Sequence, residues 1–248
     1  MASEDFPQPE TLLLSDGTDS ATLSLTRNGW KVELDVPGGK DENKKRLLEA
    51  AAQAIAIDEG GRLEYWIESI QNDCDQVPLA AGYTPYRDLW RLTRPLPAQE
   101  SRLTTRSFTP DDLSAIVSIN NRAFSWHPER SDQTIEDFEK NMQESWFNPD
   151  GLRIWESDGI IKGFCWTKIH YDLSPLKGEI YVVAVDPEFQ GEGSGTELVL
   201  AGLNWIHSNN INHAILYVES DNHPANRVYS ALGFSHEITN RAYERFIR

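Results

Sequence analysis

The segment with the clearest chemical potential is a glycine-rich run, Gln190-Gly191-Glu192-Gly193-Ser194-Gly195, which joins an apolar stretch to a helix-like one. Glycines let backbone N–H groups approach an anion without interference from a Cβ atom, and the first turn of a helix adds partial positive charge. Such a nest binds a pyrophosphate through main-chain donors and needs no basic side chain. The acidic side chains of Glu188 and Glu192 can therefore point outward while the amides point inward. The plainer alternative is a tight turn before a helix.

The other reactive residue types form no recognisable metal or nucleophile pattern. Cys74 and Cys165 lie far apart without CxxC or metal-ligand spacing, which favours a reduced compartment. His127 and His170 lack partners at useful ligand spacing, so we expect surface or hydrogen-bonding histidines and no metal. No Ser-His-Asp or Cys-His arrangement rises above chance.

The segments around the glycine run predict an α/β domain over residues 101–248. Thr109, Pro110 and Asp112 mark the start of one helix. The apolar run 179–185 is typical of a central strand covered on both faces. The other expected elements are a short β-like run over 102–108, a helix from Thr134, a hairpin over 152–170 turned at Ser157–Asp158–Gly159, a helix to about Ser208, a strand over 213–220, a helix from Asn222 to Leu232 and a β-like segment over 235–247.

The first half repeats part of this pattern. Both halves contain a helix, a strand that ends in Glu-Ser, a second helix that closes at Ala-Gly-Tyr or Leu-Gly-Phe, and a final strand. We interpret this as an internal duplication whose first copy has lost its front end; the alternative is a chance match of two generic αβ units. The proline-containing stretch 94–100 is interpreted as a linker between a degenerate domain, 1–93, and a complete one, 101–248.

Composition limits the classes of partner. The chain has 248 residues, with 39 acidic residues against 23 basic ones and a net charge of −16. This balance argues against a nucleic-acid partner or an anionic membrane surface. The start "MASEDFPQPE" lacks the features of a signal peptide, and no apolar run approaches the ~20 residues of a membrane span. We expect a cytoplasmic protein, a monomer that acts on a small molecule.

The second half resembles the GNAT acetyltransferase superfamily in the strand "IYVVAVDP" before the glycine run and in "YVESDNHPANRVYSALGF" after the next helix. Within that superfamily it is similar to the mycothiol synthase family of two-copy GNAT proteins, through "NNRAFSWHPE", "WFNPDGL", "GFCWTKIH", "GEIYVVAVDP" and "LYVESDN". The resemblance implies a tandem GNAT fold, that is, an α/β fold whose mixed central sheet is flanked by helices, with a truncated and degenerate N-terminal copy. It also implies acetyl transfer from acetyl-CoA to the cysteinyl amine of cysteinyl-glucosaminyl-inositol, the last step in making the thiol mycothiol.

The resemblance assigns acetyl-CoA as co-substrate and identifies the residues that would hold it. The strand before the loop splays from its neighbour in this superfamily, which leaves backbone groups for the pantetheine arm. Glu192 stands where the superfamily commonly has a basic residue, and Asn222 is equally a good helix N-cap. The cofactor-binding residues implied are Val183, Ala184, Val185, Gln190, Gly191, Glu192, Gly193, Ser194, Gly195, Thr196, Asn222, Asn226 and Arg227.

The resemblance also implies acceptor-binding and catalytic residues. Glu179 corresponds to the family's substrate-contacting acid and could accept the amine proton; an α-amine titrates near pH ~8, so a mild base suffices. Tyr229 lies where a tyrosine often protonates the CoA thiolate. Glu129, Lys168 and Tyr217 map to positions that touch the sugar–inositol–cysteine acceptor. The plainer alternatives are a strand-end carboxylate for Glu179 and a core aromatic for Tyr229.

The predicted reaction is direct attack by the amine, without an acyl-enzyme. Two other functions remain open from sequence: a GNAT enzyme for another small amine or a peptide N-terminus, and a non-catalytic acetyl-CoA sensor. Retention of both Glu179 and Tyr229 argues against the sensor.

Overall fold

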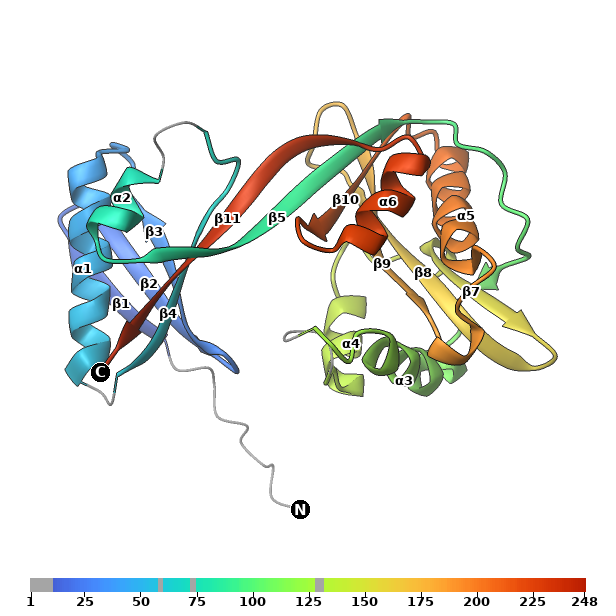
Figure 1. Cartoon of the computed structure of the whole chain (residues 1–248), viewed down its shortest axis with the longest axis horizontal. Helices are drawn as coiled ribbons and strands as arrows, with labels where there is room; N and C mark the ends of the chain where they lie inside the picture. The colour runs from blue at the N-terminus through green and yellow to red at the C-terminus, as the bar shows by residue number, and fades with distance from the viewer. Residues whose placement is uncertain (1–10, 58–59, 72–74, 128–131) are drawn as a thin grey trace, which may run out of the picture. The chain divides into compact units, whose positions relative to one another are not determined.

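The structure, a computed structural model of the chain, describes residues 11–57, 60–71, 75–127 and 132–248 (Figure 1). It comprises two compact units. The first takes described residues within Met1–Trp90 together with Glu219–Asp221 and Ile238–Arg248, and the second takes Arg91–Val218 and Asn222–Glu237. This division differs from the single cut expected at 94–100, because two long strands each contribute residues to both units: β5 (Thr84–Pro95) and β11 (Ser235–Ile247).

The second unit is a mixed sheet covered by helices on both faces, which confirms the predicted α/β class. Its strand order is β5-β10-β9-β8-β7-β6. Helix α3 packs on β8 and β9 from one face and α5 packs on the same strands from the other (Figure 1). The elements of this unit besides β5 and β11 are β6 (Arg106–Ser107), α3 (Leu113–Ala123), α4 (Ile135–Met142), β7 (Leu152–Ser157), β8 (Ile160–His170), β9 (Lys177–Val185), α5 (Ser194–Ser208), β10 (His213–Glu219) and α6 (His223–Ala231).

Local sequence signals explain where these elements begin. Thr109 and Asp112 form a capping box at a short 3-10 turn, Pro110–Asp112, that leads into α3. Thr134 caps α4 in the same way and Asn222 caps α6, as predicted. The hairpin of β7 and β8 turns at Asp158 and Gly159, where both residues have positive φ. The β-like run expected over 102–108 shortens to the two residues of β6.

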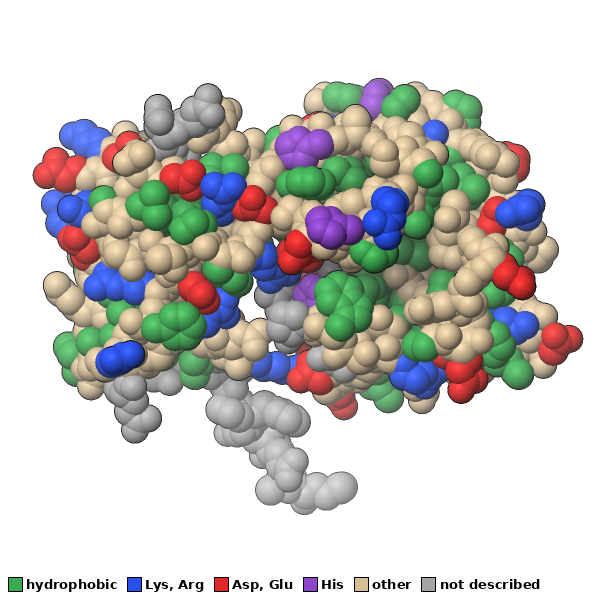
Figure 2. Space-filling model, in the orientation of Figure 1, with side chains coloured by type: hydrophobic (Ala, Val, Ile, Leu, Met, Phe, Trp, Pro, Cys, Tyr) green, Lys and Arg blue, Asp and Glu red, His purple; other side chains and the backbone are tan. Residues whose placement is uncertain are grey.

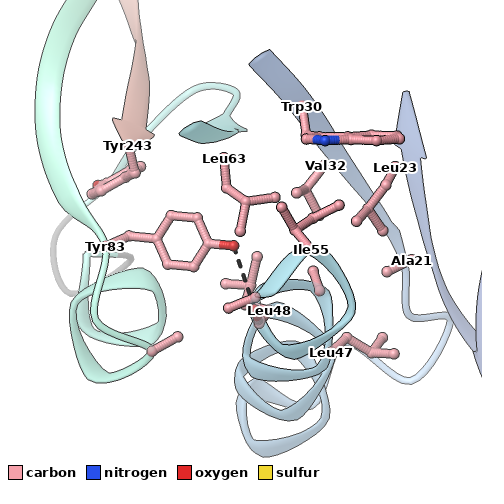
Figure 3. Close-up of a cluster of buried hydrophobic side chains, with 13 residues drawn as sticks. Ala21, Leu23, Trp30, Val32, Leu47, Leu48, Ile55, Leu63, Tyr83 and Tyr243 are labelled. Carbon is pink, nitrogen blue, oxygen red and sulfur yellow. Dashed lines mark hydrogen bonds between the residues drawn. The ribbon is translucent and has the colours of Figure 1, made fainter. Parts of the chain in front are cut away.

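The first unit has its own sheet and core. Its strand order is β1-β2-β3-β4-β11. Helix α1 lays Leu48 and Ile55 against the sheet, where they meet Leu63 and Tyr83 (Figure 3). The Tyr83 hydroxyl donates to the Leu48 carbonyl at 3.4 Å. The elements are β1 (Thr11–Asp16), β2 (Asp19–Thr26), β3 (Gly29–Asp35), α1 (Asp41–Ile57), β4 (Gly61–Ile67) and α2 (Gln76–Ala80).

The order of elements supports the duplication. In the first unit three strands, β1 to β3, precede a helix, a parallel strand, a second helix and a final strand; β7 to β11 follow the same order in the second half. In each half the central parallel pair has a register of three residues: Trp30–Val32 with Leu63–Tyr65, and Gly178–Ile180 with Ala214–Leu216. The loss of front helices from the first copy stays a prediction.

The distribution of surface charge and the character of the helices can be compared with the expectation that nucleic acids and membranes are not partners. In the view of Figure 2, Lys and Arg side chains are interspersed with Asp and Glu and do not gather into one basic patch. In the described part of the chain, no helix combines the length and the apolar character that crossing a membrane requires.

Candidate active site

Polar side chains from three strands of the second unit share one face of the sheet. Lys168 of β8 and Glu179 of β9 are register partners, so their side chains lie side by side. His170 follows Lys168 by two residues, and Tyr217 follows Ile215, the partner of Glu179 on β10, by two residues. Because side chains alternate with a period of two, all four polar groups project to the same face. The structure thus brings three predicted acceptor-binding residues together.

This face is the one that α3 and α4 cover. Trp166, two residues before Lys168, stacks against Phe138 of α4 with ring centroids 5.6 Å apart. The opposite face belongs to α5, because a Cβ atom at Gly202 would meet Cys165 and Thr167 of β8. Residues that face α3 and α4 therefore alternate along β8 with residues that face α5, as the strand geometry requires.

Glu179 is a buried carboxylate with a specific partner. The residue is 6% exposed, and its Oε2 lies 2.7 Å from Nε2 of His170. The other imidazole nitrogen, Nδ1, lies 3.9 Å from the exposed carboxylate of Asp172. Burying a carboxylate is unfavourable unless a partner compensates it, and His170 supplies that partner. This contact fixes one oxygen of the carboxylate in position.

Two further contacts hold Lys168 and Tyr217 in position. The Lys168 ammonium lies 4.8 Å from the ring centroid of Trp146, in a cation–π contact rather than in the apolar core. Arg91 hydrogen-bonds Tyr217 and places its Nε 2.9 Å from Glu237. Both side chains are therefore fixed from neighbouring elements.

The carboxylate of Glu237 sits between two cations. Lys177 Nζ donates to Oε1 at 2.7 Å, and Arg91 Nε donates to Oε2. Burial alone would raise the pKa of Glu237, but the hydrogen bond from Lys177 and the charge of Arg91 leave the pKa below its ordinary value. Because Lys177 is the register partner of His170, this ionised cluster borders the Glu179 pair.

Strand β9 separates from β10 just beyond Glu179. The described residues form three register pairs between these strands, ending at Ile180 with Leu216, although β9 continues to Val185. On its other edge β9 stays paired with β8 as far as Val185. The backbone of Val183, Ala184 and Val185 therefore has no register partner on β10, which is the splay that the resemblance implied.

A β-bulge on β9 changes which side chains face α3 and α4. The register shifts between Trp166 and Thr167, so that Trp166 pairs with Val182 and Thr167 with Ile180. Tyr181 is the extra residue. As a result Tyr181, which packs edge-on against Trp166 at 5.6 Å, and its neighbour Val182 both belong to the face covered by α3 and α4.

The glycine loop leads directly into α5 with an open backbone. Gly191 and Gly193 have φ of +104° and +82°, and a Cβ atom added to either would meet no atom within 4 Å. The helix begins at Ser194, whose amide donates to Gly191, and the Glu197 amide donates to Gly193.

The side chains around the loop leave its outer surface open to a ligand. Within the described chain, the Gly195 and Thr196 amides at the helix start donate to no backbone acceptor. Gln190 Nε2 donates to the Val185 carbonyl at 3.1 Å, which ties the loop to the end of β9. The Glu192 side chain is exposed, as expected if acid points outward. Free amides at a helix start in open space fit a pyrophosphate.

Comparison with known proteins shows the family to which the chain belongs. The Acetyltransferase (GNAT) family model matches residues 113–234. A mycothiol acetyltransferase from Thermobispora bispora is 38% identical over 249 residues, covering 94% of this chain and 83% of the relative. The chain belongs to the mycothiol acetyltransferase family. A mycothiol acetyltransferase from Amycolatopsis mediterranei is 42% identical, and the match covers 81% of this chain and 69% of the relative. One from Acidothermus cellulolyticus is 37% identical, and the match covers 78% of this chain and 65% of the relative.

Solved structures support the tandem GNAT fold of this family member. A GCN5-related N-acetyltransferase from Sphaerobacter thermophilus superposes with a TM-score of 0.73 at 19% identity, covering 93% of this chain and 77% of that one. A tandem GNAT protein from the clavulanic acid biosynthesis pathway gives 0.64 at 18% identity, covering 97% and 85%. At these identities the likeness concerns the fold.

The remaining predicted cofactor residues lie on α6 or at its N-cap. Asn222 accepts a hydrogen bond from the Ala225 amide at 3.2 Å, so it is the helix N-cap. Asn226 lies one turn further along and is half-buried, whereas Arg227 is exposed. The ring of Tyr229 packs edge-on against Phe234 with centroids 5.9 Å apart, as expected of a core aromatic. The role of the Tyr229 hydroxyl as a proton donor stays a prediction.

The structure also bears on the cysteines, the histidines and the expected absence of a metal site. Glu129 and Cys74 lie outside the described residues. Cys165 is fully buried, and burial raises its pKa to about 12, which disfavours the reactive thiolate form. Among described residues, no group of three or more His, Cys, Asp or Glu is arranged to hold a metal ion. His127 is buried with its ring against Trp126, and His170 is hydrogen-bonded, as the expectation of surface or hydrogen-bonding histidines allows.

Sequence reasoning missed that His170 belongs to the site. The sequence predicts a surface or hydrogen-bonding histidine here without naming its partner. Lys168 and His170 alternate on a strand that pairs with the strand of Glu179. In an antiparallel pair, diagonal neighbours of a cross-strand partner are within reach of long side chains, so an alternating Lys-x-His could have been tested against Glu179.

Proposed function

We propose that this protein transfers the acetyl group of acetyl-CoA to the cysteinyl amine of cysteinyl-glucosaminyl-inositol, with the second unit as the catalytic one. The observation that carries the proposal is the position of Glu179. It is a buried, imidazole-bound carboxylate at the point where β9 leaves β10, so a base lies beside the opening that a thioester arm fits. Family membership supplies the identity of the acceptor.

The chemistry follows from these positions. The neutral amine attacks the thioester carbonyl, a C–N bond forms, and the C–S bond breaks. Glu179 takes the proton that the amine loses, directly or through a water molecule, and Tyr229 gives a proton to the departing CoA thiolate. No acyl-enzyme is needed, and the buried Cys165 thiol offers no nucleophile for one.

We assign acetyl-CoA to the splay and the glycine loop. The pantetheine arm runs along the backbone of Val183, Ala184 and Val185, and the pyrophosphate accepts hydrogen bonds from the loop and from the first amides of α5. The loop residues are Gln190, Gly191, Glu192, Gly193, Ser194, Gly195 and Thr196. Asn222, Asn226 and Arg227 border the arm from α6. The open space at Gly191 and Gly193 supports this assignment.

Acceptor binding is assigned to the face that carries Glu179. Lys168 and Tyr217 flank the carboxylate and hydrogen-bond the acceptor, and Glu129 is assigned with them on the resemblance. His170 acts as a positioning residue: it holds Oε2 of Glu179, so that the other oxygen meets the amine. A substrate amine at this point lies between the base and the thioester arm.

We propose that the first unit binds no acetyl-CoA and acts as a structural copy. Residues 36–40 link β3 to α1 by a tight turn in which the Gly39 amide donates to Val36 at 2.8 Å. Helix α1 then opens with Asp41 and Glu42, which repel an anion at the helix start. In α5 the first-turn acid, Glu197, is instead bound by the Arg102 amide at 2.7 Å. A second acetyl-CoA per chain would contradict this assignment.

The test of the proposed function is an acceptor comparison. Purified protein with acetyl-CoA is given cysteinyl-glucosaminyl-inositol, glucosaminyl-inositol or a peptide amine, and products are followed by intact mass. Acetylation of the first acceptor alone is expected. Equal or faster acetylation of the peptide amine supports the alternative enzyme class, and binding of acetyl-CoA without transfer to any amine supports a sensor.

A further inference from the structure

Polar side chains from neighbouring strands form a row across the second unit, next to the residues assigned to the acceptor. The strands lie in the order β9-β10-β5-β11, and they carry Lys177, Tyr217, Arg91 and Glu237 in that order. All of these residues belong to the second unit. Because Lys177 precedes Glu179 by two residues on β9, the row starts on the face that carries the proposed base.

Glu237 connects the two ends of this row. Its two carboxylate oxygens each accept a hydrogen bond from a different cation: Lys177 Nζ at 2.7 Å and Arg91 Nε at 2.9 Å. The side chains of Glu237 and Arg91 are 27% and 23% exposed, so both are partly withdrawn from water. Isolated surface ion pairs contribute little, but several charges that form a network hold one another more firmly. Arg91 is therefore held in a defined position.

Arg91 in turn holds the hydroxyl group of Tyr217. The two side chains are hydrogen-bonded. A guanidinium group has only donors, so the phenol oxygen must be the acceptor in this bond. The O–H hydrogen of Tyr217 consequently points away from Arg91. Tyr217 is 38% exposed, and a ligand can therefore reach its hydroxyl group.

This chain of contacts defines how Tyr217 meets a ligand. A phenol can donate or accept, but with its oxygen already bound to Arg91 it meets a ligand as a donor. Donors that are fixed before the ligand arrives bind more strongly, because little freedom is lost on binding. A residue that fixes such a donor contributes to binding without touching the ligand.

We propose that Arg91 and Glu237 are positioning residues for acceptor binding: Glu237 holds Arg91, and Arg91 orients the Tyr217 hydroxyl group to donate to an oxygen atom of the acceptor. The identity of the acceptor rests on the proposed function, whereas the positioning rests on the contacts themselves. Neither residue touches the reacting atoms, so the expected consequence is a change in acceptor affinity and not in the chemical step.

The first test observes Tyr217 without any acetyl transfer. NMR is recorded on the full chain with isotopically labelled tyrosine Cζ atoms, and the signal of Tyr217 is the one that Tyr217→Phe removes. Arg91→Met and Glu237→Met are both expected to move this signal. Glu237→Gln should move it less, because a carboxamide keeps one acceptor oxygen where the carboxylate has two.

The matched control is Glu156→Gln on β7. Glu156 also accepts a hydrogen bond from an arginine, Arg106, at 2.8 Å, and its side chain is 33% exposed. This variant should leave the Tyr217 signal and the kinetic constants as in wild type. Thermal unfolding checks that each variant is folded.

The second test measures the kinetic constants for the acceptor. We expect Glu237→Met to raise KM about three- to tenfold, the value of one hydrogen bond, and to change kcat by less than about twofold. Glu237→Gln should recover part of the loss. In a double-mutant cycle, Glu237→Met should add nothing to Tyr217→Phe, because both changes remove the same oriented donor.

Three results would overturn the proposal. They are an unmoved Tyr217 signal in folded Arg91→Met and Glu237→Met, a moved signal with an unchanged acceptor KM, and a KM increase by Glu237→Met that persists in full in the Tyr217→Phe background. Failure of the proposed function looks different. If the Tyr217 signal moves as expected but no amine is acetylated, the positioning of Tyr217 stands and the proposed function fails.

Discussion

The imidazole of His170 lies 2.7 Å from the carboxylate of Glu179, across two paired strands and beside the point where β9 leaves β10. Neither residue is a sequence neighbour of the other. Their contact joins a buried acid to a titratable ring whose other nitrogen faces an exposed aspartate, Asp172. The proposed mechanism makes this held carboxylate the base, with His170 as the residue that positions it.

Replacing the carboxylate tests the role of the base. Glu179→Gln keeps the shape of the side chain and removes its basicity. We expect kcat/KM for the acceptor to fall by ~10²–10⁴-fold, the range typical of a general base. Acetyl-CoA affinity, measured by calorimetry, should change little because the carboxylate is assigned to the amine. Glu100→Gln at an exposed position is the control, and a loss below about threefold in folded Glu179→Gln would exclude this role.

His170 is expected to affect turnover more than binding. His170→Phe removes the hydrogen bond to Glu179, and we expect kcat to fall about ten- to hundredfold, the value of a hydrogen bond to a charged group. His170→Gln retains a donor and should recover part of the loss. Acetyl-CoA affinity should stay unchanged in both variants.

The exposed His213→Phe serves as the histidine control. A purely structural role for His170 predicts a different outcome: equal losses in His170→Gln and His170→Phe that track thermal stability. That result would mean that His170 does not position Glu179 for catalysis.

The glycine loop is tested by adding a side chain where a ligand should lie. Gly193→Val places bulk in open space at a positive φ, and we expect acetyl-CoA affinity to fall about ten- to hundredfold through loss of amide–pyrophosphate contacts. Gly159→Val in the β7–β8 turn has a similar φ, +73°, and equally open surroundings. Gly159→Val therefore introduces the same backbone strain at a position that is not assigned to acetyl-CoA, which makes it the control. Normal acetyl-CoA binding by Gly193→Val would mean that the loop is only a turn.

The capping box before α3 predicts a pH-dependent contribution to stability. The Arg106 hydrogen bond, followed by the Thr109 amide, holds the pKa of Asp112 below its ordinary 3.8. A depressed folded-state pKa stabilises the fold above the ordinary value, and the contribution is lost as pH falls through the folded value. We expect Asp112→Asn to lower the free energy of unfolding by about 1–3 kcal/mol near neutral pH.

Urea unfolding from about pH 7 to about pH 3 checks this assignment. The gap between wild type and Asp112→Asn should shrink at the acid end. Asp111→Asn, an exposed acid in the same turn, should show little gap at any pH. A gap for Asp112→Asn that stays constant with pH would assign the loss to packing rather than to charge.

Much of the second unit could be predicted because its signals are local. The capping residues Thr109 and Thr134, the Asp158-Gly159 turn and the apolar run of β9 each mark an element within a few residues. The glycine loop could be located for the same reason. The family resemblance added residue roles that local signals do not contain, and these roles remain predictions.

The features that the sequence did not predict depend on the pairing of strands that are separated in the chain. The bulge at Tyr181 and the His170–Glu179 contact exist only once β8 and β9 adopt their register. The sharing of β5 and β11 by both units, which shifts the expected boundary at 94–100, likewise follows from tertiary pairing. No pattern within either strand encodes its partner, because hydrophobic alternation fixes a face and not a neighbour.

The most direct measurement of the central claim identifies the atom that receives the acetyl group. Wild-type protein is incubated with acetyl-CoA and cysteinyl-glucosaminyl-inositol, the products are treated with a thiol alkylating agent, and the acceptor is analysed by mass spectrometry. We predict a product that carries one acetyl group and one alkyl group, since transfer to the amine leaves the cysteinyl thiol free, and we predict that Glu179→Gln forms it far more slowly. An acetylated acceptor that resists alkylation, or no acetylated acceptor from protein that binds acetyl-CoA, would contradict the account.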